Sequence, residues 1–254
     1  MKKKGNIMSK ILVYRMTHDS GFAPNPFGRY LTLVACTPNH MRANLQKGDW
    51  IVGLEAKHLS EQRKKARLCE KKEQLIIYVA EVSEVLNLND YFNDLRFQYK
   101  KFQKCNNWKI RRGDNVYYID NNQWKWIKGH EHNDKYKNQN YFNVNDFNKI
   151  WNNQQMKKQY KPLIQDINGN RVFISENFSY FGDKCVSFDP KFSNCVKQSQ
   201  GIKYCREENK NYKNFLDYLK DLMKNHGTGQ KGNPILCHIY DYCKNDKTDI
   251  NKSC

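Results

Sequence analysis

The segment THDSGFAPNPF, residues 17–27, holds the residue types best suited to chemistry, because an imidazole and a carboxylate are adjacent at His18 and Asp19. Histidine can act as a general acid–base near neutral pH, and a carboxylate can orient it. Two prolines restrict the loop, and rigid polar loops flanked by aromatic rings are typical of ligand pockets. We therefore predict His18 and Asp19 as catalytic or anchoring residues. The alternative is a structural loop whose Asp and Asn side chains bond to the backbone of turns.

The loop follows an apolar run, Ile11–Met16, which predicts an inner strand that holds the start of the loop firmly. Other apolar or aromatic runs predict strands at residues 30–36, 50–54, 75–86, 115–119, 123–127, 171–175, 179–181 and 236–240. The Asp-Asn-Asn sequence at 120–122 predicts a hairpin turn between two of them. Helices are expected at residues 58–72, 89–97, 145–160 and 209–225, and the last of these is amphipathic.

Several segments occur in a fixed order after the loop: TLVAC, KGDWIVGL, LIIYVAEVSEVLNLNDYFNDLRFQ, RRGDNVYYI and VFISENFSYFG. Together with THDSGFAPNPF they resemble the second of the nucleotide-modification-associated domain families, over most of residues 11–182. The resemblance implies an association with nucleotide and DNA modification systems, and it implies no established reaction. The chain differs from the family at residues 128–161, where an Asn- and Lys-rich stretch is expanded.

The order of the predicted elements lacks the regular strand–helix alternation of a doubly wound sheet. An α+β fold is expected, with a mixed, partly closed β-barrel core, peripheral helices and a C-terminal amphipathic helix. By analogy, the opening half is similar to the PUA-like barrels of modified-base readers such as the EVE and ASCH groups. We expect a single domain over residues 11–243 with a low-complexity insertion at 128–161, a basic tail at 1–10 and a polar tail at 244–254.

Readers of this kind hold a base among aromatic rings and bond to its edge. The residues expected to bind a nucleotide are polar or aromatic and lie within residues 11–182: Tyr14, Thr17, Phe22, Asn25, Asp49, Trp50, Asp114, Asn115, Tyr118 and Tyr180. Aromatic residues of strands are more often core than ligand contacts. A second stacking surface is expected on the hairpin at 115–127, where the rings are Tyr117, Tyr118, Trp124 and Trp126.

The chain carries 44 Lys and Arg against 26 Asp and Glu, a formal net charge of +18. Such a charge favours contact with phosphate, so nucleic acid or a nucleotide is the expected partner. A codon bias toward Lys and Asn is the alternative origin of the charge. No run has the length of a membrane span, and no membrane partner is expected.

Nine cysteines are present without a CxxC pair, which predicts free thiols in a reducing intracellular compartment, cytoplasm or nucleus. Cys237, His238 and Cys243 match no standard zinc spacing, so we expect no metal, and nothing indicates a cofactor. The GTGQKG sequence at 227–232 follows a predicted helix rather than a strand. It therefore predicts a helix C-cap and loop instead of a dinucleotide site.

Three functions follow from these observations. The first is a nucleotide- or nucleic-acid-binding protein that holds a base beside the THDSGFAPNPF loop. The second is an enzyme that modifies or hydrolyses a nucleotide or base, with His18 as general acid–base. The third is an interaction protein without a nucleotide ligand. The sequence decides neither whether the protein is an enzyme nor its oligomeric state.

Overall fold

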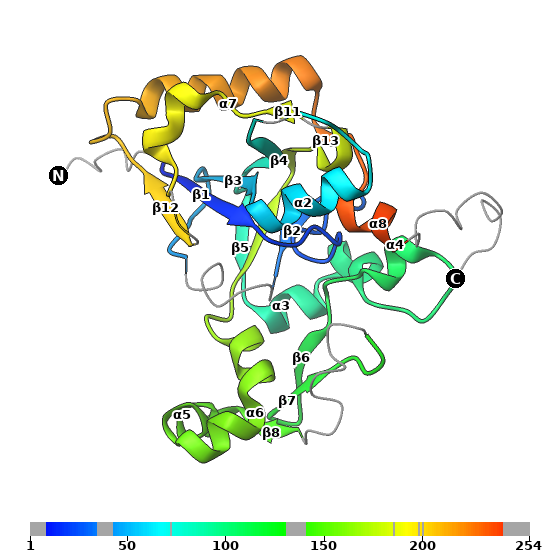
Figure 1. The fold of residues 1–254 in the computed structure, drawn as a ribbon. Coiled ribbons are helices and arrows are strands. Elements are labelled where there is room, and N and C mark those ends of the chain that lie inside the picture. Colours follow the sequence, from blue (N-terminus) through cyan, green and yellow to red (C-terminus); the bar gives the residue numbers. More distant parts are fainter. Residues whose placement is uncertain are drawn as a thin grey trace.

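A computed structural model of the chain describes residues 9–34, 43–71, 73–130, 141–184, 186–197, 199 and 201–240 (Figure 1). The predicted tail at 244–254 and most of the tail at 1–10 lie outside these residues. The same holds for residues 131–140 of the predicted insertion and for four of the nine cysteines, Cys36, Cys185, Cys243 and Cys254.

The strands are β1 (Ile11–Met16), β2 (Leu31–Leu33), β3 (Trp50–Glu55), β4 (Leu75–Glu81), β5 (Glu84–Leu86), β6 (Tyr117–Asp120), β7 (Gln123–Trp126), β8 (Phe142–Asn143), β9 (Val172–Ser175), β10 (Asn177–Tyr180), β11 (Val186–Ser187), β12 (Ile202–Cys205) and β13 (Gly229–Gln230). The α-helices are α2 (Lys57–Lys65), α3 (Leu88–Asn93), α4 (Trp108–Arg111), α5 (Phe147–Asn152), α6 (Gln154–Ile167), α7 (Tyr212–His226) and α8 (Ile235–Ile239). Short 3₁₀ helices are η1 (Leu95–Lys100), η3 (Val144–Asp146), η4 (Gly182–Lys184) and η5 (Pro190–Cys195).

The central sheet has the strand order β12-β1-β3-β4-β10-β13, with β11 paired to β4. Its middle strands are buried on both faces, as their continuous apolar sequences predict. In β1, Ile11 and Val13 face the core under α7, whereas Leu12 and Tyr14 face the core on the other side. The expected amphipathic helix is confirmed as α7, which covers the first face through Phe215 and Leu219 (Figure 1).

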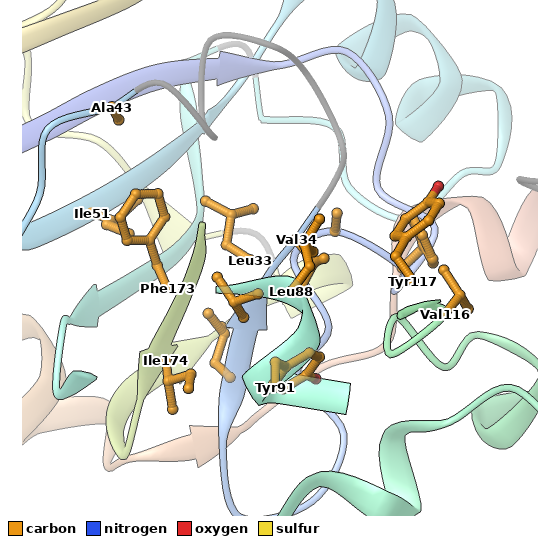
Figure 2. Packing of buried hydrophobic residues seen from close by; sticks show 14 of the residues in the cluster. Leu33, Val34, Ala43, Ile51, Leu88, Tyr91, Val116, Tyr117, Phe173 and Ile174 are labelled. Atoms are coloured by element: carbon orange, nitrogen blue, oxygen red, sulfur yellow. The ribbon is translucent and has the colours of Figure 1, made fainter. Parts of the chain in front are cut away.

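A second sheet, of order β2-β9-β5, lies on the other face of the central sheet. Figure 2 shows part of its core, in which Leu33 and Phe173 belong to the same buried cluster as Ile51 of the central sheet. The single strand predicted over residues 75–86 is wrong, because the chain changes sheets within it. β4 pairs with β3 and β10, and after Val82 and Ser83 the chain enters β5, which pairs with β9.

The α+β class is confirmed, but the partly closed PUA-like barrel is not. The three sheets traced by the described residues stay open. Within the described residues, the strand β12 at one edge of the central sheet pairs with β1 alone, and the strand β13 at the opposite edge pairs with β10 alone, so the two edges do not meet.

A third sheet, of order β6-β7-β8, forms with α5 and α6 a lobe at the bottom of Figure 1. The predicted hairpin is confirmed: β6 and β7 pair antiparallel with Tyr118 opposite Lys125. Its turn is made by Asn121 and Asn122, both with positive φ, 48° and 57°. The helix expected at 145–160 is instead η3, α5 and α6, because the chain leaves helical geometry at Asn153, which caps α6.

The strand expected at residues 236–240 is wrong, because this segment forms the short helix α8. Pro234 precedes its first turn, and the N–H groups of Ile235 and Leu236 donate to the side chain and carbonyl of Asp19. A tertiary contact thus supplies the N-terminal cap that the local sequence lacks. None of the helices in the described ranges is both long and apolar enough to cross a membrane.

Candidate functional site

Asp19 lies beneath the loop that follows β1 and is 1% exposed. Its Oδ1 accepts a hydrogen bond of 2.5 Å from the Tyr180 hydroxyl, and its Oδ2 accepts one of 3.0 Å from the Ile235 N–H. Burial raises the pKa of Asp19 to about 6, against the opposing effect of these donors. Two predicted site residues, Asp19 and Tyr180, are thus brought together as a brace between the loop, β10 and α8.

His18 points away from this brace and lies exposed at the surface. Its Nδ1 is 3.0 Å from the Thr17 hydroxyl, and its ring centroid is 5.7 Å from that of His58 in α2. Partial desolvation of the imidazole, which leaves the residue exposed, and the neighbouring His58 lower the pKa of His18. The Asp19 carboxylate bonds to other partners, so it does not orient the imidazole of His18.

A buried polar cluster lies under the second half of the loop. Lys100 Nζ donates to the carbonyl and the Oδ1 of Asn25, at 3.0 and 2.9 Å. Asp114 accepts from Thr32 at 2.6 Å and from Tyr91 at 2.8 Å. The members of this cluster are all at most 2% exposed: Asn25, Thr32, Tyr91, Lys100, Asp114 and Asn115.

Burial shifts the pKa values of the two charged groups in this cluster, Lys100 and Asp114. Burial lowers the pKa of Lys100 to about 8, and the nearby Asp114 opposes that effect. Burial likewise raises the pKa of Asp114, whereas Lys100 and the two hydroxyl donors lower it. Three predicted residues, Asn25, Asp114 and Asn115, thus meet around a lysine that the sequence did not single out. The cluster is closed to solvent, so it anchors the loop.

Three other predicted residues have structural partners. Asp49 accepts from the N–H groups of Lys10 and Gln46, at 2.9 and 2.8 Å, and so fixes the turn before β3. The Tyr14 hydroxyl is 3.0 Å from that of Tyr78 in β4. Phe22 is buried with its ring 4.9 Å from His130.

Trp50 borders an open cavity of about 370 Å³ at the end of the central sheet opposite the loop. In the register of the sheet, Trp50 of β3 is opposite Glu81 of β4, which is opposite Asn177 of β10. The Asn177 Nδ2 donates to Glu81 Oε2 at 3.0 Å. Side chains directly opposite each other in a sheet project to the same face, so these three form one row.

The helix α7 closes the other side of this cavity. Met223 contributes an apolar wall, and Lys220 and Lys224 are exposed at the rim. These lysines are four residues apart, so they are neighbours on the helix, where like charges repel. Neither is in an ion pair within the part of the chain that the structure describes. Thr228 completes the rim. It follows Gly227, the C-cap of α7, whose φ of 75° fits the predicted helix C-cap.

A second cavity, of about 450 Å³, lies beside the end of the loop at Tyr30. Its arginine, Arg96, is bound to Glu84 at 2.8 Å and to Asp94 at 2.7 Å, so its charge is neutralised by carboxylates. His18 and Asp19 are in the lining of neither of these two cavities.

The described geometry therefore has two parts: a loop anchored by buried polar groups, and an open cavity at Trp50 bordered by cations. A sequence model described as nucleotide modification associated domain 2 matches residues 8–240 of the chain. This chain belongs to that family. The match confirms the resemblance of the ordered segments and extends it to α8. No curated protein and no solved structure matches the chain.

In this member of the nucleotide modification associated domain 2 family, the sequence pattern predicted Trp50 as a site residue but did not indicate most of the other residues around its cavity. Glu81 is the last residue of β4 and Asn177 is the first residue of β10, and only the strand register places them beside Trp50. Lys220 and Lys224 carried a usable signal, a pair of like charges on one face of an amphipathic helix.

The prediction of nine free thiols is wrong at Cys237, which is disulfide-bonded. Cys69, Cys105, Cys195 and Cys205 are free. His238 bonds to Asp183, with 2.6 Å between Nε2 and Oδ2, so this histidine has a carboxylate partner.

Proposed function

We propose that this domain binds a nucleotide in the cavity at Trp50, either free or as part of a strand. The observation that carries the proposal is the row Trp50, Glu81 and Asn177 beneath two lysines that have no carboxylate partner in the described chain. A volume of about 370 Å³ falls within the usual range of small-ligand pockets. The family name supports a role connected with nucleotide modification.

The base is expected to pack against the apolar wall made by Trp50 and Met223. Glu81 is a pure acceptor when ionised, and the Asn177 Oδ1 is a second acceptor next to it. An acceptor pair recognises an exocyclic amino group, so adenine, cytosine and guanine are favoured over uracil and thymine.

The phosphate is expected to lie at Lys220 and Lys224. Two exposed lysines four residues apart weaken an isolated helix slightly, and a bound phosphate removes that repulsion. The cavity beside Tyr30 is a weaker candidate, because Arg96 is already held by Glu84 and Asp94.

Calorimetric titration with 5′-mononucleotides tests the proposal. We expect AMP, CMP or GMP to bind more tightly than UMP. The double variant Lys220→Ala/Lys224→Ala should weaken binding about tenfold or more, as the loss of charge-assisted hydrogen bonds predicts. Glu81→Gln should reduce the preference for amino-bearing bases, because an amide also donates.

The control variant is Lys64→Ala/Lys65→Ala, which removes the same charge from the exposed face of α2. It should bind as the wild type does. Equal weakening by both double variants would mean that the overall charge, and not the cavity, attracts the nucleotide. Unchanged binding in the α7 variant would overturn the proposal.

An enzymatic role for His18 is the second candidate. It is favoured by the exposed imidazole, whose lowered pKa keeps it neutral and able to accept a proton at pH 7. Asp19 would contribute by holding the loop in place. Nucleoside analysis of DNA and free nucleotides after incubation with the protein tests this role, with His18→Ala as the inactive comparison. Identical products from both proteins would exclude it.

A further inference from the structure

The outer face of the hairpin β6–β7 carries aromatic rings and lysines in alternation. Lys101 Nζ lies 3.6 Å from the ring centroid of Phe92, which stacks on Tyr118 at 4.4 Å and 18°. Tyr118 is directly opposite Lys125 in the hairpin register. The row continues to Tyr141, whose centroid is 5.5 Å from the Nζ of Lys125 and also 5.5 Å from the Nζ of Lys128. We call these six residues the aromatic–lysine row.

This face is distinct from the buried side of the same hairpin. Tyr117, Trp124 and Trp126 are at most 5% exposed and belong to the core. The alternation of the strands therefore divides the predicted stacking surface. Of its four rings, only Tyr118 faces outward, where Phe92 from α3 stacks on it. Tyr141, next to β8, lies beside Lys125 and packs edge-on against Trp126, with 4.9 Å between the ring centroids.

The charge of the row is open to an anion. Lys125 is paired with Asp120 at 2.7 Å, whereas Lys101 and Lys128 have no carboxylate partner in the described part of the chain. Partial burial lowers the pKa of Lys101, so its ammonium group has lost some water without gaining a carboxylate. A phosphate group would supply that missing partner.

We propose that the aromatic–lysine row binds single-stranded nucleic acid. Bases add to the stack at Tyr118 and Tyr141, and the lysines contact the backbone phosphates between them. Interleaved aromatic rings and cations suit a single strand, because its bases are free to stack on side chains. A duplex keeps its bases stacked on each other and would use only the lysines. The net charge of +18 is complementary to such a polyanion.

The row lies far from the cavity at Trp50. The hairpin is at the bottom of Figure 1, and α7, which borders the cavity, is at the top. The two proposals therefore rest on different residues and can fail independently.

Fluorescence anisotropy with labelled oligodeoxythymidine and oligouridine, each about 12 nucleotides long, tests the proposal. A duplex of equal length is the comparison. We expect the single strands to bind at least tenfold more tightly than the duplex at moderate salt. The two probes distinguish DNA from RNA as the source of the strand.

Two variants separate stacking from charge. Phe92→Leu/Tyr118→Leu keeps apolar volume but removes the stacked rings, and it should weaken single-strand binding about tenfold or more with little change in salt dependence. The logarithm of the association constant falls as the logarithm of the salt concentration rises. Lys101→Ala/Lys128→Ala should make this fall less steep by about 1.4, at roughly 0.7 for each lysine that contacts a phosphate.

Tyr240→Leu is the aromatic control, because this ring is 66% exposed and lies outside the row. Lys64→Ala/Lys65→Ala is again the charge control. The proposal would be overturned if the single strands and the duplex bound with equal affinity. It would also be overturned if both row variants bound single strands with wild-type affinity. Mononucleotide binding should be unaffected by the row variants, so failure here is distinguishable from failure of the Trp50 site.

Discussion

The hydroxyl of Tyr180 donates a hydrogen bond of 2.5 Å to Asp19, joining β10 to the loop that follows β1. The same carboxylate caps α8 through the N–H of Ile235. Asp19 therefore fastens three segments that are far apart in the sequence, and it does so while buried with a pKa raised to about 6.

This raised pKa predicts a pH-dependent stability. Between 3.8 and about 6, the folded protein still holds the proton of Asp19, whereas the unfolded chain has lost it. The free energy of unfolding should therefore fall as pH rises through this window, with a contribution from Asp19 of about 3 kcal/mol. Urea unfolding of the wild type and of Asp19→Asn at several pH values isolates this contribution. Parallel pH profiles for the two proteins would contradict it.

The neighbouring residues should differ sharply in their effect on stability. Asp19→Ala removes the buried carboxylate that accepts from the Tyr180 hydroxyl and the Ile235 N–H, so we expect the free energy of unfolding to fall by about 2–4 kcal/mol. His18→Ala should cost less than about 1 kcal/mol, because the imidazole is exposed. Denaturant unfolding at pH 7 measures both. Equal losses would mean that His18 also supports the core.

Lys100 should give a pH dependence of the opposite sign at alkaline pH. Burial lowers its pKa from 10.5 to about 8, so between these values the unfolded chain binds a proton that the folded protein has released. The free energy of unfolding should rise with pH across this range, with about 3 kcal/mol contributed by Lys100. Lys100→Met, which keeps the length of the side chain, should show a smaller rise. An unchanged profile would mean that Lys100 stays charged in the folded state.

Gly53 is predicted to be intolerant of any side chain. A Cβ there would lie 2.4 Å from the Tyr78 ring and 2.6 Å from the sulfur of Met16, in the middle of β3. Gly53→Ala should therefore reduce the free energy of unfolding by about 1–3 kcal/mol, the usual cost of overpacking. Urea unfolding checks this value. Wild-type stability would show that the Tyr78 ring moves aside without cost.

The sequence correctly predicted β1, β3 and α7, because the apolar pattern of each fits only one type of secondary structure. Ile11–Met16 and the strand at Trp50 are continuous apolar runs, so burial on both faces follows from their composition. The spacing of leucine and phenylalanine in α7 likewise fits only a helix with one buried face.

Other elements depended on contacts that the local sequence does not contain. The polar residues Glu81, Ser83 and Glu84 interrupt the apolar run at residues 75–86, but they do not by themselves show that its two halves pair with different sheets. The segment at α8 has a strand-like composition and becomes helical, because Asp19, 216 residues away, caps its first turn.

The candidate sites show the same division. The sequence alone determined the family, the positive charge, and the presence of His18, Asp19 and Trp50 as residues able to do chemistry. Only the tertiary structure decided that Asp19 is a buried brace, that Glu81 and Asn177 lie beside Trp50, and that Tyr118 faces outward with Phe92. The physical reason is that register and burial are set by packing between distant segments, whereas composition and periodicity are local properties of the chain.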